Sequence, residues 1–376
     1  MGVDYPKRIE ALRGRFEEVG VDAALICHRE NVAYLCGFDG SAGWLLVLPS
    51  QAVLFTDSRY TLQAEDQAPD VEVRTPEEGI QDGAVRCIND LRGRPTIAFE
   101  ANVLPWRQVE TLRPKLNRAT LVAELDLVEK LRQVKDADEL SLIRQAVAAM
   151  DAAYQATLAT LRPGMRESDF ALELEYAVRR AGHRESFTSI VASGPRSAMP
   201  HAQPTDRVME PGDFLKVDCG ARVGGYCSDM TRTVSVGEPA DPRQAAMYQA
   251  VRAALVAVEE AIRPGATGKD MDAIARKMIG DAGFGDSCYD HGLGHAIGRE
   301  VHENPRLAKR SDDVLRPGMV MTVEPGIYIG GLGGVRIEDM VYVTEDGCEV
   351  LTQTPKPEAI PCVPVATTGW GDRERT

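Results

Sequence analysis

Apolar residues follow two different periods in the first third of the chain. Four apolar side chains recur at helical spacing between Lys7 and Gly20, which predicts a helix there. Short apolar runs then alternate with further helical patterns, and these runs predict strands at 23–27, 44–49, 52–57 and 96–100. The alternation predicts a small α/β domain over residues 1–125.

The rest of the chain carries a longer helical pattern and an internal repeat. An acidic and basic stretch, Glu129 to Lys135, lies in an expected linker at 126–135, and an Ala-rich apolar stripe predicts a long helix from Asp136 to Leu161. An Arg-Pro-Gly that precedes a helical pattern ending in Ala-Gly then occurs twice, at 162–182 and 263–283. The duplication predicts a pseudo-twofold α+β domain.

We expect this second domain to span 136–355 and to be followed by a proline-containing tail at 356–376, whose end should be disordered. A length of 376 residues agrees with two domains, because single cores usually stop growing below that size. The net charge of -14 argues against nucleic acid or an anionic membrane as the main partner. No signal peptide or membrane span is visible, so we expect a cytoplasmic protein.

Acidic residues recur at matching places in the two halves of the repeat. Each half reads Pro-Gly and then an apolar run, and an acid lies seven residues after the proline, Asp218 in the first half and Glu324 in the second. A second acid follows in each half, Asp229 and Glu338. Four carboxylates facing one cleft of low dielectric could not all stay ionised, because like charges and burial raise the pKa of each. Two divalent cations would balance them.

The alternative is that these acids are ordinary surface residues, which is the usual position for any single Asp or Glu. The duplicated pattern argues against that alternative. Carboxylate ligands with one imidazole suit Mn²⁺ first, with Co²⁺ or Zn²⁺ as alternatives, better than a metal that prefers thiolate. Eight cysteines without a C-x-x-C pair fit reduced, mostly buried thiols.

Four of the six histidines lie near these acids, whereas a lone histidine is more often structural. His291 and His295 have the i, i+4 spacing of a helical zinc motif, but the glycines between them argue against a helix. We therefore expect His295 alone to be a ligand and His291 to line the substrate wall. His201 and His302 each precede the proline of their own half of the repeat.

Arg336 lies two residues before Glu338, so on a strand the two side chains share a face. We expect its guanidinium to point into the carboxylate cluster. The alternative is an exposed arginine that forms a salt bridge at the rim of the sheet.

At this point the sequence resembles a known family. Residues 291–303, HGLGHAIGREVHE, match the signature of the proline peptidases among the pita-bread metallopeptidases, a family that includes Xaa-Pro aminopeptidase, prolidase and methionine aminopeptidase. Residues 1–125, with GFDGSAG at 37–43 and DSRY at 57–60, are similar to the N-terminal domain of Xaa-Pro aminopeptidases and creatinases. Methionine aminopeptidases generally lack that domain. The resemblance thus implies a creatinase-like α/β domain before a pita-bread catalytic domain.

The resemblance also implies roles for the residues already singled out. Asp229 and Glu338 would bridge two metal ions, Asp218 would hold one of them, and His295 with Glu324 would hold the other; Glu324 would also accept a proton. The remaining expected catalytic residues are His201 and His302 at the scissile carbonyl, His291 beside the residue after the cut, and Arg336 behind the ligands. Arg299 departs from the usual aliphatic residue or Lys of the signature, which affects only the expected substrate preference.

The leading expectation is a dinuclear Xaa-Pro aminopeptidase, a homodimer that acts on peptides with proline in the second position. The alternative is a prolidase that cuts only Xaa-Pro dipeptides, in which the site closes beyond the proline. A metal-free creatinase-like protein or a binding pseudoenzyme is a distant alternative. Loss of ligands would mark that class, and all five are present here.

Overall fold

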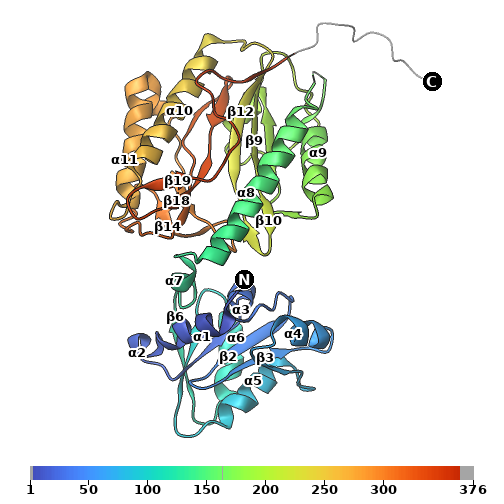
Figure 1. Ribbon diagram of the computed structural model, residues 1–376, viewed down its shortest axis with the longest axis vertical. Coiled ribbons are helices and arrows are strands. Elements are labelled where there is room, and N and C mark those ends of the chain that lie inside the picture. Colours follow the sequence, from blue (N-terminus) through green and yellow to red (C-terminus); the bar gives the residue numbers. More distant parts are fainter. Residues whose placement is uncertain (1–2, 163, 365–376) are drawn as a thin grey trace, which may run out of the picture. The chain divides into compact units, whose positions relative to one another are not determined.

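The computed structural model describes residues 3–162 and 164–364 of the chain. Its contacts divide it into two compact units, Met1–Arg132 and Gln133–Thr376 (Figure 1). No helix among the described residues combines the length and apolarity needed to cross a bilayer. The expected disordered end of the tail, at 365–376, lies outside the described residues.

A six-stranded mixed sheet forms the centre of the first unit. Its strands are β1 (Ala23–Ile26), β2 (Gly43–Val47), β3 (Ala52–Thr56), β4 (Glu72–Arg74), β5 (Thr96–Glu100) and β6 (Thr120–Glu124). Their order is β4-β3-β2-β1-β5-β6, and β1 pairs antiparallel with β2 and parallel with β5. The four strands predicted from apolar runs are all present.

Both faces of this sheet are covered by helices. Side chains alternate along a strand, so Ala24 and Ile26 pack with the cluster that includes α1, α3 and α4, whereas Ala23 and Leu25 pack with α5 and α6. A strand buried on both faces reads as a continuous apolar run, as β1 does. The helices are α1 (Tyr5–Arg13), α2 (Phe16–Val19), α3 (Arg29–Cys36), α4 (Thr61–Gln67), α5 (Ile80–Asn89), α6 (Trp106–Leu112), η1 (Arg113–Lys115) and α7 (Glu129–Arg132).

The single helix predicted from Lys7 to Gly20 is wrong in one respect, because two helices occupy this stretch. The backbone N–H of Arg15 donates to the carbonyl of Leu12 at 3.0 Å, a tighter turn than that of an α-helix. The Arg15 guanidinium then donates to the carbonyl of Asp126 at 3.2 Å. Helical spacing of apolar residues does not reveal such a break, because the apolar face continues across it.

The second unit contains two larger sheets, with strand orders β20-β12-β9-β8 and β14-β13-β15-β18-β19, and two smaller ones, β11-β10-β7 and β16-β17. The strands of its first half are β7 (Arg184–Glu185), β8 (Ile190–Ser193), β9 (Phe214–Cys219), β10 (Ala221–Val223), β11 (Tyr226–Cys227) and β12 (Met230–Val236). Those of its second half are β13 (Gly294–Ala296), β14 (Glu303–Leu307), β15 (Val320–Val323), β16 (Gly326–Ile329), β17 (Gly333–Arg336), β18 (Asp339–Val343), β19 (Cys348–Val350) and β20 (Cys362–Val363).

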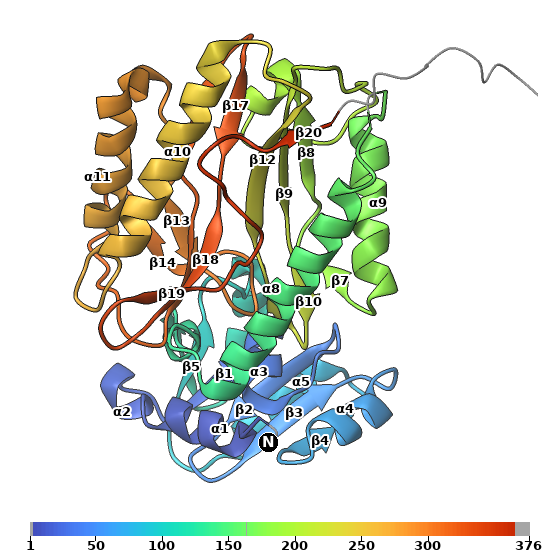
Figure 2. The same ribbon diagram turned by 45° about the horizontal axis from the view of Figure 1, so that its top comes forward.

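A pair of helices covers the sheet of each half, as Figure 2 shows with α8 and α9 on one side and α10 and α11 on the other. The helices are α8 (Ala137–Leu158), α9 (Glu167–Arg180), η2 (Gly194–Ala198), α10 (Pro242–Ala261), α11 (Gly268–Ile279), η3 (Gly280–Phe284) and η4 (Gly285–Ser287). At the start of α8 the Asp136 carboxylate accepts the Glu139 N–H at 2.8 Å and the Glu139 carboxylate accepts the Asp136 N–H at 3.0 Å, which fixes the beginning of the predicted long helix.

The same tight turn starts the first acid-bearing strand of each half. Gly212 and Gly318 have φ of 89° and 90°, each after a proline, and both turns close with a hydrogen bond from residue i+3 to residue i. Proline followed by a left-handed glycine is the pattern of a type II turn. The sequence repeat is therefore a repeat of turn and strand, and the predicted pseudo-twofold α+β architecture is confirmed.

Candidate metal centre

Strand pairing brings the four repeated acids to one place. Asp218 lies on β9, and Asp229 directly precedes β12, which pairs antiparallel with β9 so that Thr231 opposes Asp218. In the second half Glu324 directly follows β15, and Glu338 directly precedes β18, its antiparallel partner. Each antiparallel strand pair thus presents two acids at the same end.

His295 reaches these acids from β13, which pairs with β15. Its Nε2 lies 3.7 Å from Asp229 Oδ2 and 3.7 Å from Glu324 Oε1, while its Nδ1 lies 3.1 Å from the carbonyl of Ala296. If Nδ1–H donates to this carbonyl, Nε2 keeps its lone pair, which then faces the carboxylates. Metal-binding histidines usually donate the N–H of their other ring nitrogen in this way. Burial and then His302 lower the pKa of His295 to about 3, which keeps this ring neutral.

The carboxylates meet few hydrogen-bond donors. Asp218 Oδ1 is buried and has no hydrogen-bond partner in the described part of the chain. Glu338 accepts the Thr231 hydroxyl at 2.7 Å. Burial, and then neighbouring acids, raises the pKa of Asp229 and Glu324 well above the usual range and that of Glu338 to about 8. Acids held in this way fit divalent cations, which would supply the missing positive charge.

Three of the five residues, Asp229, His295 and Glu338, offer ligand atoms that all lie within 4.8 Å of one another. Asp218 and Glu324 lie outside that set but line the same cavity of about 370 Å³. Apolar side chains complete its wall, among them Phe187, Ile190 and Val301. The cavity has the size and mixed lining of a small-ligand site.

Arg336 lies behind the acids and is buried. Its guanidinium forms an ion pair with Asp218 and donates to the Thr231 hydroxyl at 3.1 Å and to the Tyr328 hydroxyl at 3.0 Å. The Tyr328 hydroxyl, which accepts from Arg336, also lies 3.2 Å from His291 Nε2.

The other three candidate histidines line the cavity. His291 has its pKa lowered to about 4, by burial first and then by Arg336. The ring of His302 packs edge-on against that of His295, with 4.4 Å between the ring centroids. Burial lowers the pKa of His302 as well. His201 follows the short helix η2 and is exposed to the cavity. Neutral imidazoles on the wall can donate an N–H to a bound carbonyl.

Sequence reasoning missed Arg306 and Lys216. Arg306 comes from β14 and lines the cavity wall, where burial lowers its pKa, and no ion pair joins it to a carboxylate among the described residues. Lys216 is fully buried two residues before Asp218, and burial followed by Arg336 lowers its pKa to about 6. Strand alternation was the available signal for Lys216, since residues two apart share a face.

Arg299 does not line the cavity. Its guanidinium lies 5.4 Å from the centre of the Tyr226 ring, and the backbone carbonyl of Arg299 accepts from Arg222 at 3.0 Å. The Arg299 side chain, which departs from the signature, therefore packs against Tyr226 and does not alter the cavity wall.

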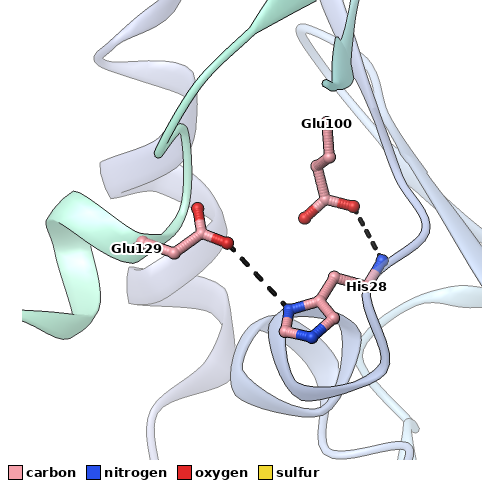
Figure 3. Close-up of side chains that lie close together, drawn as sticks. All are labelled: His28, Glu100 and Glu129. Atoms are coloured by element: carbon pink, nitrogen blue, oxygen red, sulfur yellow. Dashed lines mark hydrogen bonds and ion pairs between the residues drawn. The ribbon is translucent and has the colours of Figure 1, made fainter. Parts of the chain in front are cut away.

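A second cluster with ligand-type side chains occurs in the first unit, where His28, Glu100 and Glu129 also lie within 4.8 Å of one another (Figure 3). Here Glu100 accepts three N–H groups, from the backbones of Cys27 and His28 at 2.6 and 2.7 Å and from the Asn31 amide at 2.5 Å. The same amide donates to Glu129 at 2.7 Å. Protein donors thus stabilise these carboxylates without a metal ion.

Comparison with known proteins agrees with both units. Residues 141–345 match metallopeptidase family M24, and residues 8–134 match the creatinase/prolidase N-terminal domain. An Xaa-Pro dipeptidase of Pyrococcus furiosus is 36% identical over 93% of this chain and 98% of its own length.

Two solved structures are also similar. One is an Xaa-Pro dipeptidase from Bacillus anthracis, with a TM-score of 0.91, 40% identity and coverage of 96% of this chain and 100% of the other. The second is an X-Pro aminopeptidase from Thermotoga maritima, with a TM-score of 0.87, 38% identity and coverage of 94% and 99%. This chain therefore belongs to metallopeptidase family M24, with a pita-bread catalytic domain that follows a creatinase-type N-terminal domain.

Proposed function

We propose that this protein hydrolyses the peptide bond between an N-terminal residue and a following proline. Two divalent ions, with Mn²⁺ expected before Co²⁺ or Zn²⁺, would be held by Asp218, Asp229, His295, Glu324 and Glu338. The observation that carries the proposal is the neutral ring of His295, whose Nε2 lies 3.7 Å from the buried Asp229 and 3.7 Å from the partly buried Glu324. Divalent cations at such a site polarise a carbonyl and lower the pKa of water.

The side chains have separable tasks in this reaction. Glu324 is the most exposed of the acids paired with His295 or Arg336, with 17% of its side chain accessible against 7% for Asp229 and 11% for Asp218. This exposure supports Glu324 as the acid that takes a proton from water and returns it to the proline nitrogen. His302 and His201 can donate an N–H to the carbonyl as negative charge develops on it.

Arg306 favours a dipeptide as the substrate. Arg306 feels the charge of Glu324 but forms no ion pair or hydrogen bond with a carboxylate among the described residues, so its guanidinium suits the free carboxylate of an Xaa-Pro dipeptide, which would form paired hydrogen bonds with it. Relatives named Xaa-Pro dipeptidase agree with this choice. We therefore place the prolidase activity ahead of the aminopeptidase activity that the sequence alone favoured.

One observation supports the aminopeptidase as the second candidate. Arg306 and Ala308 also border a neighbouring hollow of about 520 Å³, lined further by Arg310 and Asp312. A peptide longer than two residues would continue from the cavity into this hollow.

Kinetics on three substrates separate the two activities. An Xaa-Pro dipeptide, its C-terminal amide and an Xaa-Pro-Xaa tripeptide should be compared for the unmodified protein, for Arg306→Gln and for Arg263→Gln, an exposed control away from the cavity. A charge-assisted hydrogen bond is worth about 1.5–3 kcal/mol, so Arg306→Gln should lower kcat/KM for the dipeptide about 10- to 100-fold and have little effect on its amide. Equal use of dipeptide and tripeptide, with no selective loss in Arg306→Gln, would assign the aminopeptidase.

Proline specificity needs its own measurement. Replacing the second-position proline by alanine should strongly lower kcat/KM, because the cavity would no longer hold a pyrrolidine ring. Equal turnover of the proline and alanine peptides would reject a proline peptidase.

A further inference from the structure

Lys216 is a buried lysine on the strand that carries Asp218. Its neighbours Leu215 and Val217 belong to the apolar cluster under α8 and α9, so alternation turns Lys216 to the other face of the strand, the face that carries Asp218. A buried amine is costly unless it is hydrogen-bonded. A lysine buried at this place therefore needs hydrogen-bond partners.

Those partners are two consecutive backbone carbonyls. Lys216 Nζ donates to the carbonyl of Met199 at 2.7 Å and to that of Pro200 at 3.3 Å. Arg336 also donates to the Pro200 carbonyl, at 3.2 Å. The amine lies 5.1 Å from the centre of the Tyr328 ring, which closes it in from another side. Two buried basic side chains, Lys216 and Arg336, therefore hold the backbone directly before His201.

This stretch has few other restraints. Met199 is 44% exposed, and Pro200 has no N–H to donate. The side chain of His201 makes no hydrogen bond to another described residue, so its place depends on the backbone that carries it. The backbone N–H of Met199 also donates to the carbonyl of Arg196 at 3.0 Å, and the Arg196 guanidinium donates to the carbonyl of Gln203 at 2.7 Å. Directly before the ring, the carbonyls of residues 199 and 200 are held by Lys216 and Arg336.

The second half of the repeat shows a similar arrangement at the equivalent position. Thr322 lies two residues before Glu324, as Lys216 lies two before Asp218. The Thr322 hydroxyl accepts the backbone N–H of His295 at 3.2 Å. In the second half, the residue two places before the first acid thus binds the backbone of a cavity histidine, and in the first half it binds the two residues directly before one.

We infer that Lys216 is a positioning residue for His201, which it places against the substrate through the carbonyls of Met199 and Pro200. The inference rests on the proposed function, in which His201 donates to the scissile carbonyl. Arg336 cannot replace the amine, because its other nitrogens are engaged by Asp218 and Thr231. An amine donates hydrogen bonds whether it is charged or neutral, so this role does not depend on its protonation.

The test is Lys216→Met, which keeps the length of the side chain and removes its donors. We expect two bound metal ions as in the unmodified protein, a fall in kcat of about 10- to 100-fold and a much smaller change in KM. In a His201→Ala background the same change should have almost no further effect on kcat. An equal loss of kcat in both backgrounds, or loss of metal from Lys216→Met, would overturn the inference.

A second readout needs no substrate. The chain has six histidines, so the ring Cε1–H signals of the zinc-loaded protein can be assigned one by one with single variants. Lys216→Met should shift the His201 signal and leave those of His28 and His183 in place. An unmoved His201 signal would contradict positioning, even if the protein proves inactive on Xaa-Pro peptides and the proposed function fails.

Two further variants separate a general loss of stability from a loss of His201 positioning. Val217→Ala removes packing on the helix side of the same strand and should leave both the His201 signal and kcat unchanged, which separates loss of stability from loss of positioning. Lys216→Gln retains an N–H donor and should keep part of the kcat that Lys216→Met loses. If Lys216→Met does not fold, a Lys216→Gln protein with an unshifted His201 signal and unchanged kcat would overturn the inference.

Discussion

Two clusters in this molecule bring a histidine within ligand distance of two acids, yet only one has the character of a metal site. In the first unit, the carboxylate of Glu100 accepts three N–H groups. In the second unit, the carboxylate of Asp229 accepts no hydrogen bond among the described residues, and its neighbour is the neutral His295 at 3.7 Å. Proximity alone does not identify a metal site. The informative feature is a buried acceptor without a donor.

The two clusters also differ in how their charge is balanced. In the first, the Asn31 amide joins Glu100 to Glu129, and Arg132 donates to the Asn31 side-chain oxygen at 2.6 Å. In the second, Arg336 pairs with Asp218, and the pKa values of the remaining acids are raised. Burial raises the pKa of Glu100 in the first cluster as well, but three N–H donors to its carboxylate act against that rise, and no such donors meet Asp229 or Glu324 among the described residues. The second cluster therefore has the carboxylates that a divalent cation would ionise.

The largest expected effect comes from Asp229→Asn. An amide is a weak ligand for two cations at once, so the variant should lose bound metal, and peptide hydrolysis should fall to background. The matched change in the first unit, Glu100→Gln, should keep full metal content and differ mainly in stability. Elemental analysis of both proteins after loading with Mn²⁺ checks the pair, and retention of two ions by Asp229→Asn would refute the bridging role.

A smaller effect separates two histidines of the second cluster. His302→Ala should keep both ions and lose about 10²- to 10³-fold in kcat, because it removes a donor to the developing charge. His295→Ala should instead weaken the binding of one ion. Metal titration together with single-turnover kinetics distinguishes them, and equal depletion of metal in the two variants would show that the assignment is wrong.

The pH dependence of stability should differ between metal-free and metal-loaded protein. The pKa of Glu338 is about 8 in the folded metal-free protein against 4.5 ordinarily, so its bound proton stabilises the fold at low pH. That stabilisation is lost as pH rises through about 8, at ~1.4 kcal/mol for each unit of pKa difference. Bound metal keeps the carboxylate ionised, so the gap in Tm should widen from about pH 5 to 8. Glu338→Gln should flatten the metal-free curve, and a gap that narrows with pH would contradict the linkage.

Much of the catalytic unit could be predicted because its information is local and duplicated. Proline before a left-handed glycine starts both acid-bearing strands, and an apolar run of fixed length then delivers Asp218 and Glu324 to equivalent strand ends. Antiparallel pairing brings the second acid of each half back to the same end.

The residues that were missed depend on contacts distant in sequence. Periodicity places Lys216 on the cavity face but does not reveal that its amine meets the loop at residues 199 and 200, 17 and 16 positions away. Arg306 was missed because no pattern in the sequence of β14 indicates that its side chain lines the cavity. The break between α1 and α2 was missed because a continuous apolar face conceals a tighter turn.

The stoichiometry of bound metal tests the central claim most directly. It should be measured by elemental analysis on the full chain and on the double variant His28→Ala, Glu129→Gln, after identical loading with Mn²⁺ and removal of free ion. We predict close to two ions per chain in both proteins, because only the second cluster has acids without donors. A third ion that disappears in the double variant, or no bound metal in the unmodified protein, would contradict the account.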